Sequence, residues 1–311
     1  VYKPNKDFNA DGKSDILLKK VTLLGNEYYA DIITGTKHIQ SKVYTTGLTK
    51  NIVAIGDFNL DKKADLVETD ASGVITNLVL LSGLPSTTTI VPAPFAVTVT
   101  GTQPTGTVVK AAADFNADGV DDLLLHNASS GEFYIALMPS TISSGTSSIE
   151  LSYSLVNTLS NSFVFKGVAD FNSDGKQDIV WFDSSADTIQ ISYMNGSTET
   201  SNSSFYTPSY VLEGTGHFFV KDSANLILRD SFGQLFVASI QDGSAELTLV
   251  ASLASSYKIA DIADYNGNGL DDIWWRHTTT AVNGIYSFIN NVVSKISMAS
   301  LLASMGLATN S

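Results

Sequence analysis

A nine-residue pattern of acidic and amide residues recurs five times along this 311-residue chain. The first copy, DFNADGKSD, begins at Asp7, and the others begin at Asp57, Asp114, Asp170 and Asp264. Positions 1, 3, 5 and 9 carry side-chain oxygens in every copy, and position 6 is glycine in all but the second. Oxygen donors that alternate around a sharp turn suit a hard cation with about six to eight oxygen ligands. The pattern therefore predicts Ca²⁺ at each copy, about five sites in all.

The predicted ligands of each loop are the side chains at positions 1, 3, 5 and 9 and the backbone carbonyl at position 7. The second loop has Lys62 where glycine is preferred, and the fifth has Asn268 instead of an acid at position 5, so both should bind more weakly. In chain order the ligands are Asp7, Asn9, Asp11, Lys13 and Asp15, then Asp57, Asn59, Asp61, Lys63 and Asp65, then Asp114, Asn116, Asp118, Val120 and Asp122, then Asp170, Asn172, Asp174, Lys176 and Asp178, and finally Asp264, Asn266, Asn268, Leu270 and Asp272.

Other occupants and other roles for these loops are less favoured. Mg²⁺ demands a tighter octahedron, and the absence of cysteine disfavours softer metals. An EF-hand needs a glutamate at position 12, where this chain has Glu68 in the second copy and core-type residues in the others. Turns without any metal are the simplest alternative, since Asp, Asn and Gly favour turns anyway. Because nothing repeated beside the loops supplies an acid, a base or a substrate group, we expect the metal to be structural.

The spacing of the copies organises the whole chain into repeats. The last gap, from Asp170 to Asp264, is about twice the others, which predicts a sixth copy near residue 217 that has lost its acidic loop and its calcium. Each copy combines an apolar strand entering the loop, a second apolar strand after it, a turn, a third strand and a less regular fourth strand. Four strands in roughly 50 residues, without helical periodicity, are typical of one propeller blade.

The predicted fold is therefore an all-β propeller of four-stranded antiparallel blades that forms a single domain over residues 1–311. Six blades fit the repeats, and seven is the alternative. We expect the N- and C-terminal strands to pair and close the ring. The polar tract from Gly196 to Ser204 is interpreted as a long loop between strands, and the segment from Ala299 to Ala308 as a short helix or a last strand.

The composition excludes several classes of protein. With 18 basic and 31 acidic residues the formal charge is −13, which argues against binding to nucleic acid. No apolar run approaches the length of a membrane-spanning helix, so membrane insertion is not expected. Of the 31 acids, 14 are aspartates at the predicted ligand positions of the five loops. Their charge would be largely neutralised by bound Ca²⁺, so we expect the metal-free chain to be less stable.

The phrases DFNADGKSDILLK and DYNGNGLDDIWWRHTTT, together with YMNGS at Tyr193 to Ser197, resemble the FG-GAP and VCBS repeats of bacterial extracellular proteins. Related repeats form the propeller of integrin α chains. The resemblance covers nearly the whole chain and implies a β-propeller with calcium in its blade loops, at Asp7, Asn9, Asp11, Asp15 and their equivalents. It also implies a secreted or cell-surface protein that serves in adhesion, lectin-like glycan binding or protein docking.

No catalytic residue can be named from the sequence. The histidines, His38, His126, His217 and His277, lack metal-binding spacing, and neither a nucleophile elbow nor a phosphate-binding loop is present. A row of residues one position beyond the core site of the second strand, Lys19, His126 and Arg276, is a candidate ligand-facing surface.

The sequence thus predicts a non-enzymatic, calcium-binding module outside the cell, with a glycan or a surface protein as partner and its oligomeric state open. The first alternative is a polysaccharide-active hydrolase or lyase on the same scaffold, because two acids from distant blades can meet in space. The second alternative is a purely structural domain of a larger adhesin.

Overall fold

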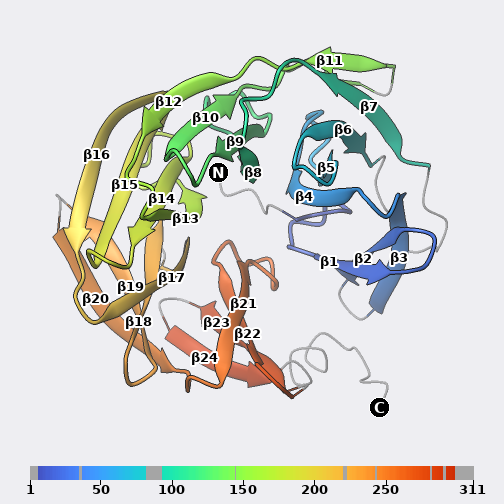
Figure 1. Cartoon of the computed structure of the whole chain (residues 1–311). Coiled ribbons are helices and arrows are strands. Elements are labelled where there is room, and N and C mark those ends of the chain that lie inside the picture. The colour runs from blue at the N-terminus through green and yellow to red at the C-terminus, as the bar shows by residue number, and fades with distance from the viewer. Residues whose placement is uncertain are drawn as a thin grey trace. The chain divides into compact units, whose positions relative to one another are not determined.

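The structure is a computed structural model that describes residues 6–34, 37–81, 93–143, 145–219, 223–241, 244–280, 282–289 and 292–297. Within these ranges every regular element is a strand, and the strands form six small sheets (Figure 1). No helix in this part of the chain could cross a membrane. The chain divides into two compact units, each of which holds three sheets.

The first unit, called the N-terminal unit, comprises residues 3–161 and 195–198. Its first sheet has three strands, its second has five and its third has four. The strands of the first sheet are β1 (Ile16–Val21), β2 (Asn26–Thr34) and β3 (Lys37–Thr46). Those of the second are β4 (Asn51–Gly56), β5 (Asp65–Thr69), β6 (Ile75–Leu80), β7 (Phe95–Thr100) and β11 (Ser148–Glu150). Those of the third are β8 (Val108–Ala113), β9 (Asp122–His126), β10 (Glu132–Ala136) and β12 (Ser154–Thr158).

The second unit, called the C-terminal unit, comprises residues 1–2, 162–194 and 199–311. Each of its three sheets has four strands in chain order. They are β13 (Phe163–Ala169), β14 (Asp178–Asp183), β15 (Thr188–Asn195) and β16 (Thr198–Tyr206), then β17 (Tyr210–Gly216), β18 (Asn225–Asp230), β19 (Gln234–Gln241) and β20 (Ser244–Ser252), and last β21 (Tyr257–Ala263), β22 (Asp272–His277), β23 (Asn283–Ile289) and β24 (Val292–Ser297).

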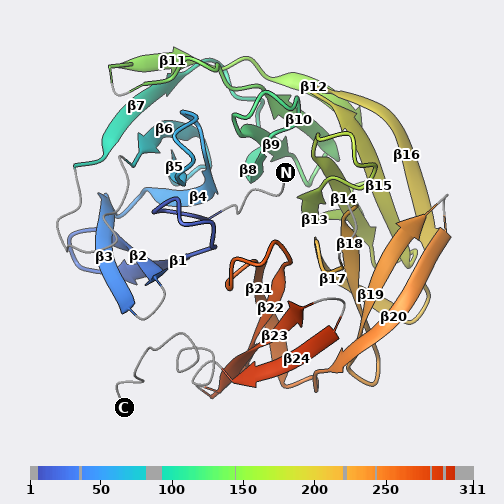
Figure 2. The same cartoon turned by 180° about the vertical axis from the view of Figure 1, so that it is seen from behind.

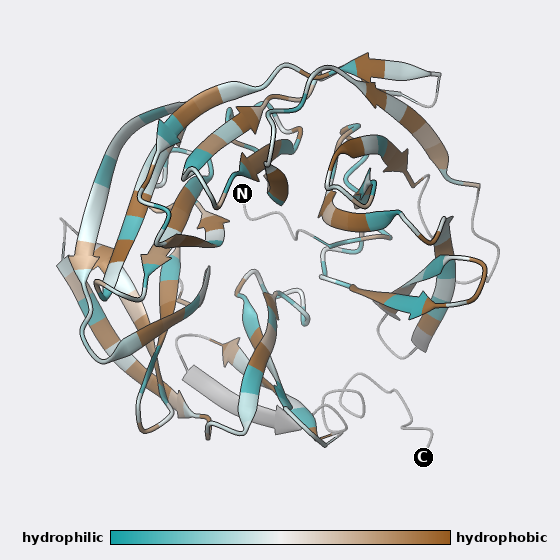
Figure 3. Cartoon of the chain, viewed as in Figure 1, coloured by the Kyte–Doolittle hydropathy of each residue, from teal (hydrophilic) through white to brown (hydrophobic). Residues whose placement is uncertain are grey.

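Burial changes in a regular way from the second strand of a sheet to the fourth. The second strands β5, β9 and β14 are buried along their whole length, and each has an apolar run directly after its first aspartate. The fourth strands β16 and β20 are mostly exposed, and β16 is largely hydrophilic (Figure 3). Trp181 and Trp275, at position 12 of their repeats, are buried core residues.

In the N-terminal unit, the second and third sheets are linked in two ways. Their first strands, β4 and β8, lie side by side (Figures 1 and 2). In addition, β11 lies between two strands of the third sheet in the sequence but pairs in parallel with β7 of the second sheet. Hydrogen bonds from Thr98 N to Ser147 O, at 3.1 Å, and from Leu151 N to Thr100 O, at 2.9 Å, extend this pairing at both ends.

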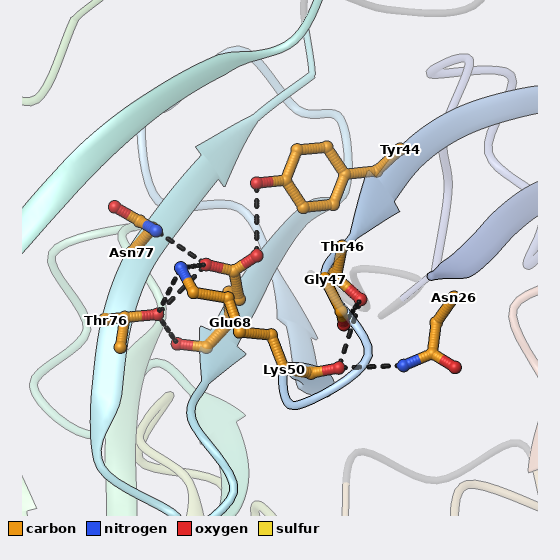
Figure 4. A network of polar contacts seen from close by, with 8 residues as sticks. All are labelled: Asn26, Tyr44, Thr46, Gly47, Lys50, Glu68, Thr76 and Asn77. Carbon is orange, nitrogen blue, oxygen red and sulfur yellow. Dashed lines mark hydrogen bonds and ion pairs between the residues drawn. The ribbon is translucent and has the colours of Figure 1, made fainter. Parts of the chain in front are cut away.

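A buried carboxylate joins the first and second sheets of the same unit. Glu68, at the core position 12, is 1% exposed and accepts hydrogen bonds from Lys50 Nζ and Asn77 Nδ2, both at 2.6 Å (Figure 4). Thr76 Oγ1 donates at 3.0 Å, and Tyr44 OH donates from β3 at 3.2 Å. Burial alone would raise the pKa of Glu68, but these donors outweigh it and hold the pKa below its ordinary value. The site thus keeps an ionised glutamate where other repeats have apolar residues.

The prediction of an all-β, six-bladed propeller is confirmed at this level, but several details differ. The first blade has three strands among the described residues instead of four, and the second has five. The predicted closure of the ring and the segment from Ala299 to Ala308 depend on residues outside the described ranges. The tract from Gly196 to Ser204 was predicted to be a loop, which is wrong: it forms a turn followed by most of β16. Its polar composition fits an outer strand with little buried surface.

Replacing Glu68 with glutamine should lower the free energy of unfolding by about 1–3 kcal/mol, because charge-assisted hydrogen bonds are lost in a buried setting. Since the pKa of Glu68 is lowered in the folded state, this contribution is present above the ordinary value of 4.5 and is lost as the pH falls through the folded pKa. Urea denaturation of both proteins at pH 7 and pH 4 should therefore show the difference narrowing at pH 4. An equal difference at both pH values would contradict the role of the charge.

Candidate functional site

The five acidic loops share one backbone conformation. Positions 4 and 6 are both left-handed in every loop, with φ between 59° and 91°. Glycine adopts this conformation freely, but other residues do so at a cost of about 1 kcal/mol or more. Lys62, at position 6 of the second loop, has φ 65° and therefore carries this cost. The left-handed pairs are Ala10 and Gly12, Leu60 and Lys62, Ala117 and Gly119, Ser173 and Gly175, and Gly267 and Gly269.

The carboxylate at position 1 lies at the centre of each loop's hydrogen bonds. In the first loop, Asp7 Oδ1 accepts from the N–H groups of Asn9 and Asp11, both at 3.2 Å, and Oδ2 accepts from Gly12 N at 2.8 Å. The bond from position 6 to position 1 recurs in every loop, at 2.7–2.9 Å. The loop backbone therefore wraps around this carboxylate.

The side chains at positions 3 and 5 are held by the next part of the loop. Asn9 Oδ1 accepts from Asp11 N at 3.0 Å, and Asp11 Oδ1 accepts from Lys13 N at 3.0 Å. The same two bonds occur in the other four loops, at 2.8–3.0 Å. Positions 1, 3 and 5 thus hold their oxygens within one tight turn.

The aspartate at position 9 has a different setting. It is fully buried, and one of its oxygens accepts from the N–H of the position 2 aromatic residue in every loop, at 2.9–3.2 Å. In the last four loops the other oxygen accepts from a backbone N–H on the third strand of the same sheet or just after its end, for example from Met194 N on β15 to Asp178 Oδ1 at 2.9 Å. Among the described residues no three acidic or histidine side chains gather at one possible metal site. The structure therefore brings positions 1, 3 and 5 together and places position 9 in the scaffold.

The position 9 carboxylates also have perturbed acidities. Burial raises the pKa of Asp65 to about 8, and the nearby acids Asp61 and Asp57 add to this effect against the lowering by backbone N–H groups. Burial likewise raises the pKa values of Asp122, Asp178 and Asp272 to about 7. The pKa of Asp7 at position 1 is also raised, mainly by burial. A divalent cation nearby would favour the ionised forms of all these groups.

The donor set fits a hard cation. Aspartate and asparagine oxygens at positions 1, 3 and 5 are preoriented by backbone N–H groups, and carboxylate charge accumulates at positions 1, 5 and 9 of the first four loops. Such a cation would need carbonyl or water oxygens to complete its coordination, because position 9 already binds two N–H groups in the last four loops.

The sixth repeat keeps the scaffold of the loop without its acids. His217, Phe218 and Asn225 stand at positions 1, 2 and 9, and Phe218 N donates to Asn225 Oδ1 at 3.2 Å. Asn225 Nδ2 then donates to Ser239 Oγ, at 3.2 Å, on the third strand. The spacing of the repeats predicted this copy near residue 217, but without residue assignments for its loop. The available signal was Phe218, a buried aromatic residue that lies seven residues before Asn225, as position 2 lies seven residues before position 9 in the other loops.

A cavity of about 510 Å³ lies in the C-terminal unit, away from the loops. Glu213 on β17, Arg229 and Asp230 on β18, Phe232 in the following turn, and Lys258 on β21 contribute to its lining. Arg229 Nε lies 2.8 Å from Glu213 Oε1, and its Nη1 donates to Tyr257 O at 3.0 Å. The cavity therefore combines two carboxylates, two cations and an exposed aromatic ring.

The structure divides the predicted ligand-facing row. Lys19 and Arg276 are exposed, whereas His126 is buried, and burial lowers the pKa of this histidine. Arg229 occupies the same position in the sixth repeat and lines the cavity. Arg229 is absent from the predicted row because its repeat has lost the acidic loop that marks the position of the other members.

Comparison with known proteins establishes the fold class and no family. No protein-family model matches the chain, and no curated protein matches it in sequence. The solved β-propeller domain of Myceliophteria thermophila Cps50 (Swd1) matches with a TM-score of 0.51 and 7% identity, over 94% of this chain and 85% of that chain. At this identity the likeness shows the fold alone, which is that of a β-propeller.

The prediction that the chain is not an enzyme is contradicted by two further similar structures. One is named as a putative 6-phosphogluconolactonase from Bacteroides uniformis, with a TM-score of 0.47 and 12% identity over 94% of this chain and 80% of that chain. The other is the periplasmic gluconolactonase of Pseudomonas aeruginosa, with a TM-score of 0.49 and 9% identity over 90% and 80%. Both of these propellers are named as enzymes. No substrate follows from likenesses of this degree.

Replacing Asp122 with asparagine should destabilise the metal-free protein by about 1–3 kcal/mol, because an amide has one acceptor oxygen for two buried N–H donors. Asp118→Asn is the matched control, since this side chain is exposed and its bond from Val120 N needs only the one oxygen that an amide also provides. The bond that its other oxygen accepts from Asn116 Nδ2 is lost, but it is exposed to water. The effect of Asp118→Asn should stay within about 0.5 kcal/mol. Urea denaturation in the presence of a chelator measures both, and equal effects would contradict the scaffold role of position 9.

Proposed function

We propose that the five acidic loops bind Ca²⁺ and that the bound ions stabilise the blades. The observation that supports this best is the recurrence of one loop conformation, with positions 4 and 6 left-handed and the oxygens of positions 1, 3 and 5 turned into the loop. The second loop is the weakest predicted site because Lys62 carries backbone strain, and the fifth has fewer acids. The resemblance to FG-GAP and VCBS repeats supports the same proposal.

Calcium would also account for the accumulation of charge in the loops. Each of the first four loops has aspartates at positions 1, 5 and 9. In the second, third and fourth loops burial raises the pKa of the position 9 group, and repulsion by the other two aspartates adds to this effect. Divalent ions would replace that repulsion by attraction. An extracellular location, where calcium is millimolar, suits loops of modest affinity. Secretion, and a glycan or surface protein as partner, belong to this proposal as predictions that depend on it.

Addition of 1 mM Ca²⁺ should raise the melting temperature, and a chelator should reverse the change. A site with a dissociation constant near 10 µM would contribute about 2.7 kcal/mol at that concentration. Differential scanning calorimetry in Ca²⁺, Mg²⁺ and chelator measures this effect. Asp118→Ala should reduce the gain from calcium, whereas Glu246→Ala on the exposed strand β20 should not. An unchanged melting temperature in calcium would contradict the proposal.

The second candidate is a hydrolase whose active site is the cavity of the C-terminal unit. The observation that favours it is the approach of Glu213, Asp230, Arg229 and Lys258 to one cavity, because carboxylates held beside cations can act as acid and base. Arg229 is 12% exposed, so the ion pair with Glu213 is largely shielded from water. Asp230 Oδ1 accepts from Phe232 N and Gln234 N, which leaves Glu213 as the better candidate for proton transfer.

Hydrolysis should be assayed on a panel of polysaccharides and sugar lactones with the wild-type protein, Glu213→Gln and Glu246→Gln. If the cavity is an active site, the wild-type protein and Glu246→Gln turn over one of these substrates, and Glu213→Gln loses at least about 100-fold in rate. Binding of the same compounds without turnover would favour a lectin-like role instead. Equal activity of Glu213→Gln and the wild-type protein would exclude Glu213 from catalysis.

A further inference from the structure

Successive repeats are joined by a hydrogen bond that recurs in both units. In each case the N–H at position 8 of one repeat donates to the carbonyl oxygen at position 1 of the preceding repeat. The bond thus joins the acidic loop, or its remnant, of one repeat to that of the preceding repeat. The pairs are Ala64 N to Asp7 O at 2.8 Å and Asp121 N to Asp57 O at 3.0 Å in the N-terminal unit, and Ala224 N to Asp170 O at 2.9 Å and Asp271 N to His217 O at 2.6 Å in the C-terminal unit.

Two of these joints have a second hydrogen bond from a side chain. Asp121 Oδ2 accepts from Asp57 N at 2.8 Å, and Asp271 Oδ2 accepts from His217 N at 2.7 Å. In both cases one aspartate of the following repeat binds the N–H and the carbonyl of the same residue at position 1. Both aspartates are buried, so the bonds are shielded from water.

A glycine makes room for each of these aspartates. A Cβ atom on Gly56 would lie 2.8 Å from Asp121 Oδ2, and one on Gly216 would lie 2.8 Å from Asp271 Oδ2. Neither glycine has a left-handed backbone, so close approach is the feature that requires them. We call these the Gly–Asp joints. The other two joints have Lys6 or Ala169 before position 1 and alanine at position 8.

The same rule holds along the sequence of all six repeats. Glycine stands immediately before position 1 where the next repeat has aspartate at position 8, and it is absent where the next repeat has alanine or glutamine there. The residue pairs in chain order are Lys6 with Ala64, Gly56 with Asp121, Ala113 with Gln177, Ala169 with Ala224, and Gly216 with Asp271.

We propose that each Gly–Asp pair acts as one unit that docks a blade on its neighbour, and that Asp121 is a positioning residue for the calcium loop of residues 57–65. The second statement rests on the proposed calcium binding, and the first does not. Loop 57–65 is the one with the strained Lys62, and its first ligand, Asp57, is held on both sides by Asp121. The neighbouring blade thereby orders the loop before an ion arrives, which lowers the entropic cost of binding.

The Gly56 and Asp121 pair can be tested by a double-mutant cycle in chelator, with Gly56→Ala, Asp121→Ala and the combined variant. A methyl group at residue 56 would displace the Asp121 carboxylate, which releases Asp57 N–H, and it would also lie 3.0 Å from the Cβ atoms of Asp121 and Ala112. Each single change should therefore lower the melting temperature by about 3 to 6 °C, and the combined variant should lose clearly less than the sum of the two single losses. The combination reproduces the pair Ala169 and Ala224 that the chain already uses. Additive losses would overturn the joint.

The joint between Gly216 and Asp271 is the matched control for calcium. Its position 1 residue is His217, so Asp271→Ala should destabilise the protein without changing the calcium response of residues 57–65. The loop of residues 264–272, which contains Asp271 beside the predicted ligand Asp272, is left out of this comparison. If Gly216→Ala and Asp271→Ala fail to show the same non-additivity as the first joint, the rule relating the two residues is wrong.

Hydrogen exchange followed by mass spectrometry tests the positioning role, with the calcium concentration that protects each loop as the readout. In Asp121→Ala the peptide covering residues 57–65 should need about 10-fold more calcium, while the peptides covering residues 7–15 and 170–178 should not change. Asp121→Asn should retain most of the affinity, because its amide oxygen can still accept from Asp57 N. An unchanged response of residues 57–65, or the same shift in Asp271→Ala, would overturn the role of Asp121. If calcium protects no loop even in the wild-type protein, calcium binding itself fails, and the cycle in chelator still decides the joint.

Discussion

The buried aspartate at position 9 is the interaction on which the rest of each blade depends. One carboxylate oxygen binds the backbone at the start of the acidic loop, and in most blades the other binds a backbone N–H on the third strand or just after its end. A single side chain thus connects the loop, the second strand on which it stands and the third strand. An unsatisfied backbone N–H in this buried setting would cost free energy comparable to a lost hydrogen bond, so the aspartate is needed whether or not a metal is present. Asn225 shows the nearest uncharged substitute, since its amide provides an acceptor for one partner and a donor for the other.

The fold could be predicted from the sequence to the level of blades because the repeat is strong where burial is strong. The position 2 aromatic residues and the apolar runs of the second strands are buried, and their spacing alone gives the order of strands. The outer strands could not be recognised in the same way. The residues of β16 are polar and mostly exposed, so no hydrophobic alternation marks them as a strand. The short strand β11 has no sequence signal either, since its partner β7 lies about 50 residues earlier in the chain.

The candidate site was predictable in part for similar reasons. Positions 1, 3 and 5 lie within five residues of one another, so local backbone geometry brings their oxygens together as the pattern predicts. Position 9 follows a different rule, because its partners are strands whose positions depend on the whole sheet. The cavity beside Arg229 depends on contacts between two sheets and therefore has no local pattern. The excess of acidic over basic residues is explained largely by the aspartates of the loops. The residues that would recognise a ligand in the cavity lie outside the repeated loop pattern.

The parallel strand β11 has a consequence for the order in which the chain can assemble during synthesis. The second sheet contains residues from 51 to 100 and then borrows residues 148–150, which are made only after the first three strands of the third sheet. Once residues 51–100 have left the ribosome, β7 is therefore an unpaired edge strand until β11 has also been synthesised. At a typical rate of about 5–20 residues per second, that edge stays unpaired for a few seconds. During synthesis, the second sheet therefore cannot be complete before most of the third sheet has been made.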